Sequence, residues 1–234
     1  MSGKYSAVLF SGGLDSAVLL AEAARDGRVR ALYVSVGFAW EREERAAIAR
    51  LLAAPPFANA VEPPVELRFD MLDVFPASHW AVRGVAPAFD TPDEDVYLHG
   101  RNVTLLSKAA IYMARHRASD AATDPADVIR ILLGPLAGNP FPDATPEFFD
   151  TMARALSLGL ATPIAIEAPF RSLHKHEVIR RGIELGVPLE LTLSCMQPEE
   201  GMHCGRCSKC RERRDAFREA AVDDPTSYRQ PPIR

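Results

Sequence analysis

The feature that most constrains this chain is the turn Ser-Gly-Gly-Leu-Asp-Ser at residues 11–16. The residues before it, 5–10, form an apolar run that is too short for a helix, and this predicts a buried strand. The residues after it, 17–23, carry apolar side chains at helical spacing, which predicts a helix. A turn rich in Ser and Gly thus joins a buried strand to a helix, with Asp15 and Ser16 in the first helical turn.

Such a turn is suited to bind phosphate. Glycines let the backbone approach an anion closely, and the unpaired N–H groups at a helix start favour negative charge. The hydroxyl groups of Ser11 and Ser16 add hydrogen-bond donors. No Lys follows the glycines, which excludes the Gly-Lys-Ser/Thr loop of many nucleoside-triphosphate-binding proteins. The structural alternative is an ordinary strand–turn–helix corner in which a serine caps the helix.

Strands and helices alternate along the rest of the chain. Apolar runs predict further strands at residues 29–36, 128–133 and 163–169, and residues 65–69 are the expected third strand. Helical spacing predicts helices at 40–52, from 101 through 113, at 146–158 with Thr145 as its cap, and from 173 to about 186. This alternation favours right-handed crossovers onto one sheet, so we expect an α/β fold with five parallel strands and helices on both faces.

Length and composition limit the class of protein. The 234 residues suit one domain with a small appendage, and 47% hydrophobic with 25% charged residues is typical of a globular protein. A formal net charge of −4 argues against a dedicated nucleic-acid binder. No apolar run approaches the ~20 residues that span a bilayer, and the N-terminus enters a strand at once. We therefore expect no membrane segment and a cytoplasmic location.

Three further segments are candidates for one pocket. The turn Gly100-Arg101-Asn102 opens a helix, and an arginine beside a helix start suits phosphate or carboxylate, although Arg101 taken alone is an ordinary surface arginine. Gly134 ends the fourth predicted strand, and ligands of open parallel sheets bind beyond the strand ends, so residues 134–143 should border the pocket. The long irregular segment 71–98 is either a flexible cover over that pocket or a plain surface excursion.

The cysteines lie together in one short segment near the C-terminus, at Cys195, Cys204, Cys207 and Cys210. This clustering is typical of metal ligation rather than of a disulfide framework. Two short loops of two residues bring thiolates to one centre, and four thiolates make a closed tetrahedral site of the structural zinc type. The alternatives are iron–sulfur ligation and unrelated buried cysteines. Such a site predicts that metal binding holds the C-terminal segment onto the sheet.

The other polar residues of this segment are expected to be ordinary surface residues. Four cysteines suffice for a metal, so His203 is expected to be a surface histidine. The basic residues are expected to form a solvated face: Arg206, Lys209, Arg211, Arg213 and Arg214. We expect residues 1–190 to form the α/β domain, residues 191–222 to form the zinc-binding segment packed on it, and residues 223–234 to form a tail that is loose from Pro225.

Several of these motifs together resemble one known family. The turn at residues 11–16 resembles the pyrophosphate loop of the N-type ATP pyrophosphatases, whose substrates are activated by adenylylation with release of pyrophosphate. Over nearly its whole length the chain resembles the 7-cyano-7-deazaguanine synthases of the queuosine and archaeosine pathways. The matching segments are that loop, Gly100-Arg101-Asn102 and residues 169–177, 185–188, 192–195 and 204–211. The four-cysteine pattern after Leu-Gly-Val-Pro is the most specific of them.

The resemblance implies a fold, cofactors and site residues. The implied fold is the Rossmann-like sheet of the adenine nucleotide alpha hydrolase-like type, and the implied cofactors are ATP, Mg²⁺ and one structural Zn²⁺. Asp15, Arg101 and Lys175 are the implied catalytic residues, although Lys175 taken alone is a surface lysine at a helix start. The cysteines would hold the zinc. The residues implied to bind the nucleotide are Phe10, Ser11, Gly12, Gly13, Leu14, Asp15, Ser16, Gly100, Arg101, Asn102, Gly134 and Lys175.

The chain departs from the family after the fourth predicted strand. The family carries Glu-Thr-Asp and then Ser-Gly-Tyr-Pro-Asp-Cys-Arg there, whereas residues 134–145 keep only Pro142-Asp143 in a shorter loop. This segment should face the base and the carboxylate of the acceptor. Because a site that hydrogen-bonds a polar purine edge discriminates strongly, the loss of these partners should weaken the selection of a deazaguanine.

The leading interpretation is therefore an ATP-dependent ligase that adenylylates 7-carboxy-7-deazaguanine and aminates it with ammonia, to the nitrile or the amide. Alternatives are a paralogue that activates a different carboxylate or joins it to another amine, a tRNA-modifying enzyme of the same superfamily, and a nucleotide-binding scaffold without activity. The resemblance also implies a homodimer. The expected partners are a small carboxylate, in the first place a 7-deazapurine, and ammonia, with no nucleic acid and no membrane.

Overall fold

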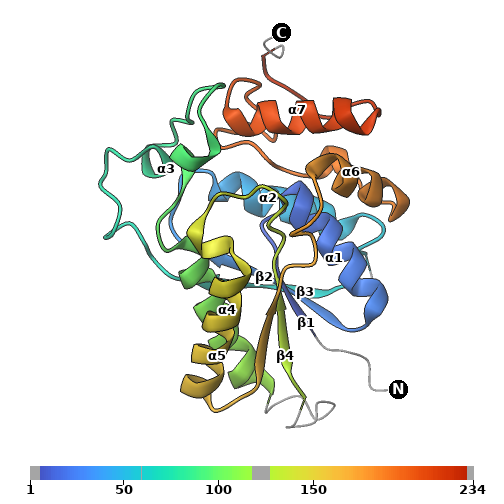
Figure 1. Cartoon of the computed structure of the whole chain (residues 1–234). Coiled ribbons are helices and arrows are strands. Elements are labelled where there is room, and N and C mark those ends of the chain that lie inside the picture. Colours follow the sequence, from blue (N-terminus) through green and yellow to red (C-terminus); the bar gives the residue numbers. More distant parts are fainter. Residues whose placement is uncertain (1–5, 59, 118–126, 231–234) are drawn as a thin grey trace.

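The protein is built on one five-stranded parallel sheet, seen in a computed structural model that describes residues 6–58, 60–117 and 127–230 (Figure 1). The strand order is β3-β2-β1-β4-β5, and every neighbouring pair runs parallel. The chain order therefore reverses between β1 and β4. The strands are β1 (Ser6–Leu9), β2 (Val29–Ser35), β3 (Glu62–Arg68), β4 (Ile129–Leu132) and β5 (Ile164–Glu167). The sheet confirms the expected Rossmann-like fold.

Helices cover both faces of the sheet (Figure 1). Side chains alternate between the faces along a strand, so Val8 and Tyr33 pack with α1, α2, α6 and α7, whereas Ala7 and Leu32 pack with α4 and α5. Each face thereby has its own apolar core. The helices are α1 (Leu14–Asp26), α2 (Glu41–Ala53), α3 (Trp80–Arg83), α4 (Arg101–Arg117), α5 (Pro146–Leu160), α6 (Lys175–Glu184) and α7 (Ser208–Ala220).

Two elements differ from the sequence-based expectation. Strand β3 begins at Glu62 rather than at residue 65, and it runs through Pro63 and Pro64. An edge strand tolerates proline because one of its sides has no ladder partner, and β3 is the edge of this sheet. Helix α7 was not expected, because the run of arginines from Arg211 was interpreted as a solvated face. Part of this helix packs in the same core as α1 and α6.

The segment 71–98 and the C-terminal end are more ordered than predicted. Segment 71–98 contains α3 and a 3₁₀ turn η1 (Asp93–Val96), and it packs on β2 through an apolar cluster with Phe75 and Leu98. The end of the chain was expected to be loose from Pro225. Instead, the His203 N–H donates to the Ser227 carbonyl at 2.9 Å, so this end is bonded to the cysteine segment. Among the described helices, none has the length and apolar character needed to cross a membrane.

Candidate active site and four-cysteine cluster

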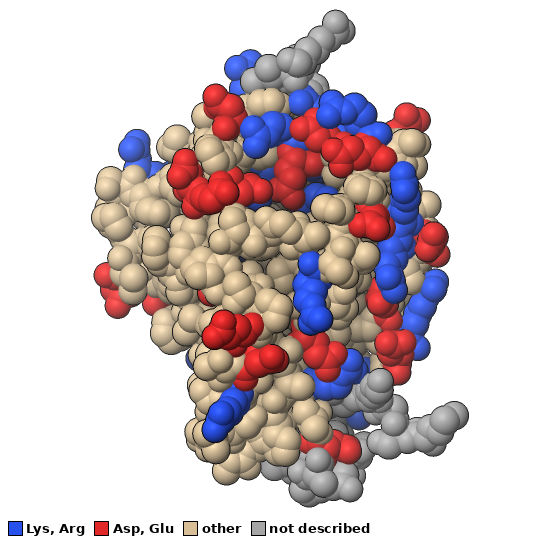
Figure 2. Space-filling view, in the orientation of Figure 1, with Lys and Arg blue, Asp and Glu red and all other residues tan. Residues whose placement is uncertain are grey.

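A cavity of about 430 Å³ lies at the carboxyl ends of β1, β2 and β4. It is lined by the turn after β1, the starts of α4 and α6, the loop after β4, part of segment 71–98, and two residues of α7. Ligands of open parallel sheets bind at the point where the strand order reverses, and the turn after β1 sits there. In Figure 2, acidic and basic side chains meet in the hollow beneath α7. The sequence-predicted residues that line the cavity are Phe10, Ser11, Gly13, Leu14, Asp15, Ser16, Arg101, Asn102, Gly134 and Lys175.

Two serines of the turn after β1 form hydrogen bonds within the turn. The Ser16 hydroxyl donates to the Gly13 carbonyl at 3.0 Å, and the Gly13 N–H donates to the Ser11 oxygen at 3.4 Å. Gly13 is the residue that precedes α1, and no side chain caps this helix. The structure therefore does not contain the serine-capped corner that was the alternative interpretation, and the helix start remains available to an anion.

Gly12 and Gly100 shape the turns without lining the cavity. Gly12 has φ +74°, and a Cβ there would lie 3.2 Å from Ile48 of α2, so its side faces away from the cavity. Its carbonyl accepts from the Leu193 N–H at 2.8 Å, which ties the segment before the cysteines to the turn. Gly100 has φ +75° just before α4. Both positions need glycine for the left-handed backbone conformation.

Lys175, the first residue of α6, lines the cavity and lies between two acids. Its Nζ is 3.2 Å from Asp15 Oδ2 and 2.6 Å from Glu212 Oε1. Burial disfavours the charged form, but the carboxylates of Asp15 and Glu212 outweigh it and hold the pKa of Lys175 above its usual range. Lys175 is therefore a fixed cation next to the turn. Glu212 comes from α7, and no sequence pattern pointed to it.

Arg101 and Asn102 open α4 beside the loop after β4. The Asn102 backbone N–H donates to Asp143 Oδ2 at 3.1 Å, and its side-chain amide donates to the Asp143 carbonyl at 2.9 Å. Asp143 thus fixes the start of α4, and its burial raises the pKa of its carboxyl while the bonds from Asn102 lower it. The backbone N–H and the side-chain amide of Asn102 therefore both have a hydrogen-bond partner in Asp143. Arg101 Nε is buried with no hydrogen-bond partner among the described residues.

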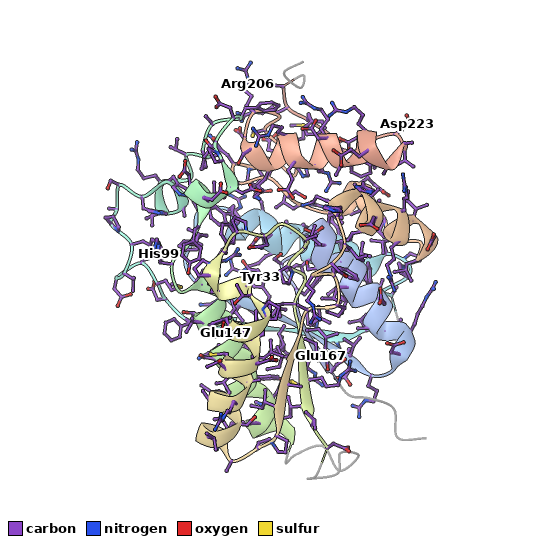
Figure 3. The ribbon with its side chains drawn as sticks, viewed as in Figure 1. Tyr33, His99, Glu147, Glu167, Arg206 and Asp223 are labelled. Carbon is purple, nitrogen blue, oxygen red and sulfur yellow. The ribbon has the colours of Figure 1, made fainter. Side chains whose placement is uncertain are left out.

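A second buried acid of the cavity wall was not predicted. The Tyr33 hydroxyl, from the middle of β2 (Figure 3), donates to Glu44 Oε2 at 2.8 Å. Burial raises the pKa of Glu44, and the nearby charge of Arg101 lowers it. Burial and the Glu44 charge also raise the pKa of Tyr33. Both side chains line the cavity. The one sequence feature that could have pointed to Glu44 is its position in the first turn of the helix after β2. Solvated acids are equally typical of that position.

Segment 71–98 borders the cavity with Trp80, Asp93 and Tyr97, among others. Phe89 of this segment lies under the guanidinium groups of Arg211 and Arg214, 5.8 and 5.0 Å from its ring centre. The segment is thus attached to α7 at the rim of the cavity. Of the two interpretations weighed for this segment, the structure favours the cover.

The four cysteine sulfurs form a compact buried cluster, all within 4.8 Å of one another. Three of the sulfur–sulfur distances are 3.4, 3.8 and 3.9 Å. A tetrahedron of four 2.3 Å metal–sulfur bonds has edges of about 3.8 Å, so the donor set fits one metal ion. Backbone N–H groups of Gln197, Cys204 and Arg206 donate to cysteine sulfurs, as they do around thiolates.

Two predictions about the residues around the cysteines are wrong. His203 is 3% exposed rather than on the surface, and its Nε2 accepts from the Ser194 N–H at 3.0 Å. Burial, followed by the Arg213 charge, lowers its pKa to about 3, so it stays neutral. The basic run is not one solvated face, because Lys209 lines the cavity and Arg213 is 0% exposed. Arg206 alone has the expected outward position (Figure 3).

Arg213 anchors α7 to the segment before the cysteines, and we expect its loss to destabilise the protein. Its guanidinium donates to four acceptors, namely the Thr226, Thr192 and Ser194 hydroxyl oxygens and the Leu189 carbonyl. In Arg213→Met these buried and partly buried acceptors lose their donor, which should lower the free energy of unfolding by about 2–3 kcal/mol. Thermal unfolding measures the change. Arg206→Met is the matched control and should leave the midpoint unchanged; an equal midpoint for both variants contradicts the anchoring role.

The chain is similar to proteins of one known family over nearly its whole length. The family model of the queuosine biosynthesis protein QueC matches residues 5–221. The chain belongs to this family. A 7-cyano-7-deazaguanine synthase of Methanopyrus kandleri is 33% identical over 94% of this chain and 97% of its own length. Those of Methanoculleus marisnigri and Anaeromyxobacter dehalogenans are also 33% identical, over 96% and 94% of this chain and 99% and 94% of their own lengths.

Proposed function

We propose that the protein is an ATP-dependent ligase that converts a carboxylate to its adenylate and then aminates it, with 7-carboxy-7-deazaguanine as the acceptor. One observation carries the proposal: the phosphate-binding turn, Lys175 and Arg101 come from three separate places in the chain and line a single cavity. Family membership supports the chemistry, because the relatives that match over nearly their full length are named 7-cyano-7-deazaguanine synthase.

The proposed first step makes a poor electrophile reactive. A carboxylate oxygen of the acceptor attacks the α-phosphorus of ATP, the bond from this phosphorus to the bridging oxygen breaks, and pyrophosphate leaves with the electron pair. The N–H groups of residues 11–16, Lys175 and Arg101 are the groups that stabilise the charge developing on the phosphates. Such preorganised electrostatic stabilisation is usually the largest catalytic term. Magnesium bound at Asp15 would neutralise phosphate charge.

The proposed later steps form carbon–nitrogen bonds. Ammonia attacks the carbonyl carbon of the adenylate, AMP leaves, and the nitrogen loses a proton to give an amide. The amide oxygen then attacks the α-phosphorus of a second ATP, which releases pyrophosphate, and loss of AMP together with both protons of the amide nitrogen leaves the nitrile. In both rounds the residues around the turn after β1 perform the same work, since each round transfers the same group from ATP. The one cavity thus serves the amide and the nitrile alike.

The remaining assignments belong to the same proposal. We assign zinc to the four-cysteine cluster in a structural role, because all four donors are sulfur and no ligand position is left for water. Cysteines held as metal ligands and not as disulfides suit a reducing compartment, which supports a cytoplasmic location. Ammonia as the amine source and a homodimeric assembly rest on the family resemblance.

A different acceptor is the second candidate, and the loop after β4 favours it. Residues 134–141 line the cavity, and they carry no acid and no arginine. A guanine-like edge presents N–H donors and is selected by acceptors, so this part of the wall supplies little selectivity. A paralogue that activates another carboxylate would keep the turn, Lys175 and Arg101 and change this loop.

Mass spectrometry of the reaction products tests the proposed function. We expect the metal-loaded protein to convert 7-carboxy-7-deazaguanine to the nitrile when it is incubated with ATP, magnesium and ammonium. Amide without nitrile indicates that the protein stops after one adenylylation. No product, with ATP binding still detectable, contradicts the deazaguanine acceptor and favours the paralogue. A reaction without ammonium is the control, and it should accumulate no aminated product.

A further inference from the structure

An alternating row of five charged side chains crosses the cavity from α1 to segment 71–98. Asp15 contacts Lys175, which contacts Glu212, which contacts Lys209, which contacts Asp93. The four distances in this order are 3.2, 2.6, 2.8 and 3.0 Å. The row connects α1, α6, α7 and η1, and all five residues line the cavity.

Glu212 is the centre of this row. Its Oε1 accepts from Lys175 Nζ and its Oε2 accepts from Lys209 Nζ, so each carboxylate oxygen holds one lysine. The Lys175 side chain is 13% exposed, and those of Glu212 and Lys209 are 29% and 26% exposed. Charges this far from solvent are screened less than surface pairs, so the contacts are stronger than ordinary surface salt bridges.

We infer that α7 supplies two working residues to the phosphate site: Glu212 is the positioning residue of Lys175, and Lys209 is a second cation for the phosphates. The inference rests on the proposed function, since it concerns the same ATP site. It adds two residues of the four-cysteine segment to the ATP site, whereas the role assigned to this segment above is structural.

The positioning role of Glu212 follows from the flexibility of lysine. A lysine side chain carries about 2 kcal/mol of rotamer entropy, and Asp15 alone gives Lys175 one contact that leaves its position loose. The short contact to Glu212 from the opposite side fixes the ammonium group before the nucleotide arrives. A cation fixed in advance stabilises a developing charge without reorganising at the moment of reaction.

The role of Lys209 follows from charge balance. Glu212 and Asp93 place two negative charges in a cavity that is to accept a polyphosphate. Lys209 contacts both and offsets them, and it brings a positive charge to the same wall. Loss of Lys209 leaves both acids facing the phosphates, so binding of the nucleotide weakens. Loss of the Glu212 charge does the reverse, since it removes a repulsive group.

The two roles predict different effects on the affinity for Mg-ATP, measured by calorimetry on the metal-loaded protein. For Glu212→Gln we expect a Kd that is equal to or lower than that of the wild type, and pyrophosphate release that is about 10- to 100-fold slower. For Lys209→Met we expect a Kd about tenfold higher, restored by Lys209→Arg. Glu219→Gln, an exposed acid on the same helix, is the matched control and should change neither quantity.

A double variant separates positioning from a general loss of structure. If Glu212 acts through Lys175, then adding Glu212→Gln to a protein that already carries Lys175→Met does not slow pyrophosphate release any further. Weaker ATP binding in Glu212→Gln, or turnover equal to the wild type, overturns the inference. The ligase proposal is judged separately. If the wild type binds Mg-ATP but yields no product, that proposal fails, and a higher Kd in Glu212→Gln or an unchanged Kd in Lys209→Met still overturns the inference.

Discussion

Replacement of Cys207 by Ser is expected to release the metal and to lower the thermal midpoint of the protein by more than 10 °C. Cys207 is 1% exposed, and its sulfur lies 3.4 Å from that of Cys210. Metal ligation in small zinc domains is worth roughly 10–16 kcal/mol of apparent folding free energy. Loss of about 5 kcal/mol, between a third and a half of this, corresponds to roughly 10–20 °C for a chain of this size.

The effect should extend beyond the cysteines, because α7 contributes to the core of the sheet. Phe217 and Ala220 pack with α1 and α6, and Lys209 and Glu212 line the cavity. Metal content by elemental analysis and thermal unfolding measure the two parts of the prediction. A chelator should reproduce the loss in the wild type, and added zinc should reverse it.

Ser208→Ala is the matched control for Cys207→Ser. Ser208 is the next residue along the chain, it is buried, and its hydroxyl has no hydrogen-bond partner among the described residues. Its removal should change neither metal content nor the midpoint by more than a few degrees. Full metal content in Cys207→Ser would contradict the assignment of this residue as a ligand.

The sheet could be predicted from the sequence because its signals are local. Four of the five strands, β1, β2, β4 and β5, are mainly apolar, each crossover contains a helix with apolar spacing, and the turn after β1 is recognisable by its glycines. The prediction was weaker for β3, because whether a strand tolerates proline depends on its position in the sheet. Residues 62–64 contain two prolines, which argue against a strand unless the strand is known to lie at an edge.

Helix α7 was missed because a charged residue occupies its buried stripe. Cys210, Phe217 and Ala220 are buried at helical spacing, and the position between them is held by Arg213. A fully buried arginine is rare, since it needs hydrogen-bond partners that sequence spacing does not reveal. Here those partners lie before the cysteines and after α7. The apparent basic run was therefore a helix with one buried cation.

The pairing of charges in the cavity could not be predicted for a related reason. Lys175 and Glu212 lie 37 positions apart and meet only because α6 and α7 pack at one particular register. The proposed phosphate-binding turn, by contrast, contains its donors within six residues. The sequence thus indicates which groups are candidates to bind phosphate, and the tertiary packing decides which charged groups lie beside them.

The largest expected effect on activity is that of Lys175→Met. We expect pyrophosphate release at saturating ATP to fall by about 10²–10³-fold, which corresponds to ~2.7–4 kcal/mol of transition-state stabilisation. The ammonium group lies between Asp15 and Glu212 beside the turn, and its pKa is held above the usual range, so it is charged at any working pH. No other described group contacts both acids from this position.

Stability and activity must be separated in this variant. Without Lys175, the carboxylates of Asp15 and Glu212 face one another with no cation between them, and this should also lower the thermal midpoint. Glu212→Gln in the same chain removes one of these charges, so the double variant should regain midpoint without regaining turnover. Lys108→Met, a lysine of α4 that does not line the cavity, is the matched control. If Lys175→Met keeps more than a tenth of the wild-type rate while folded, Lys175 is not a catalytic residue.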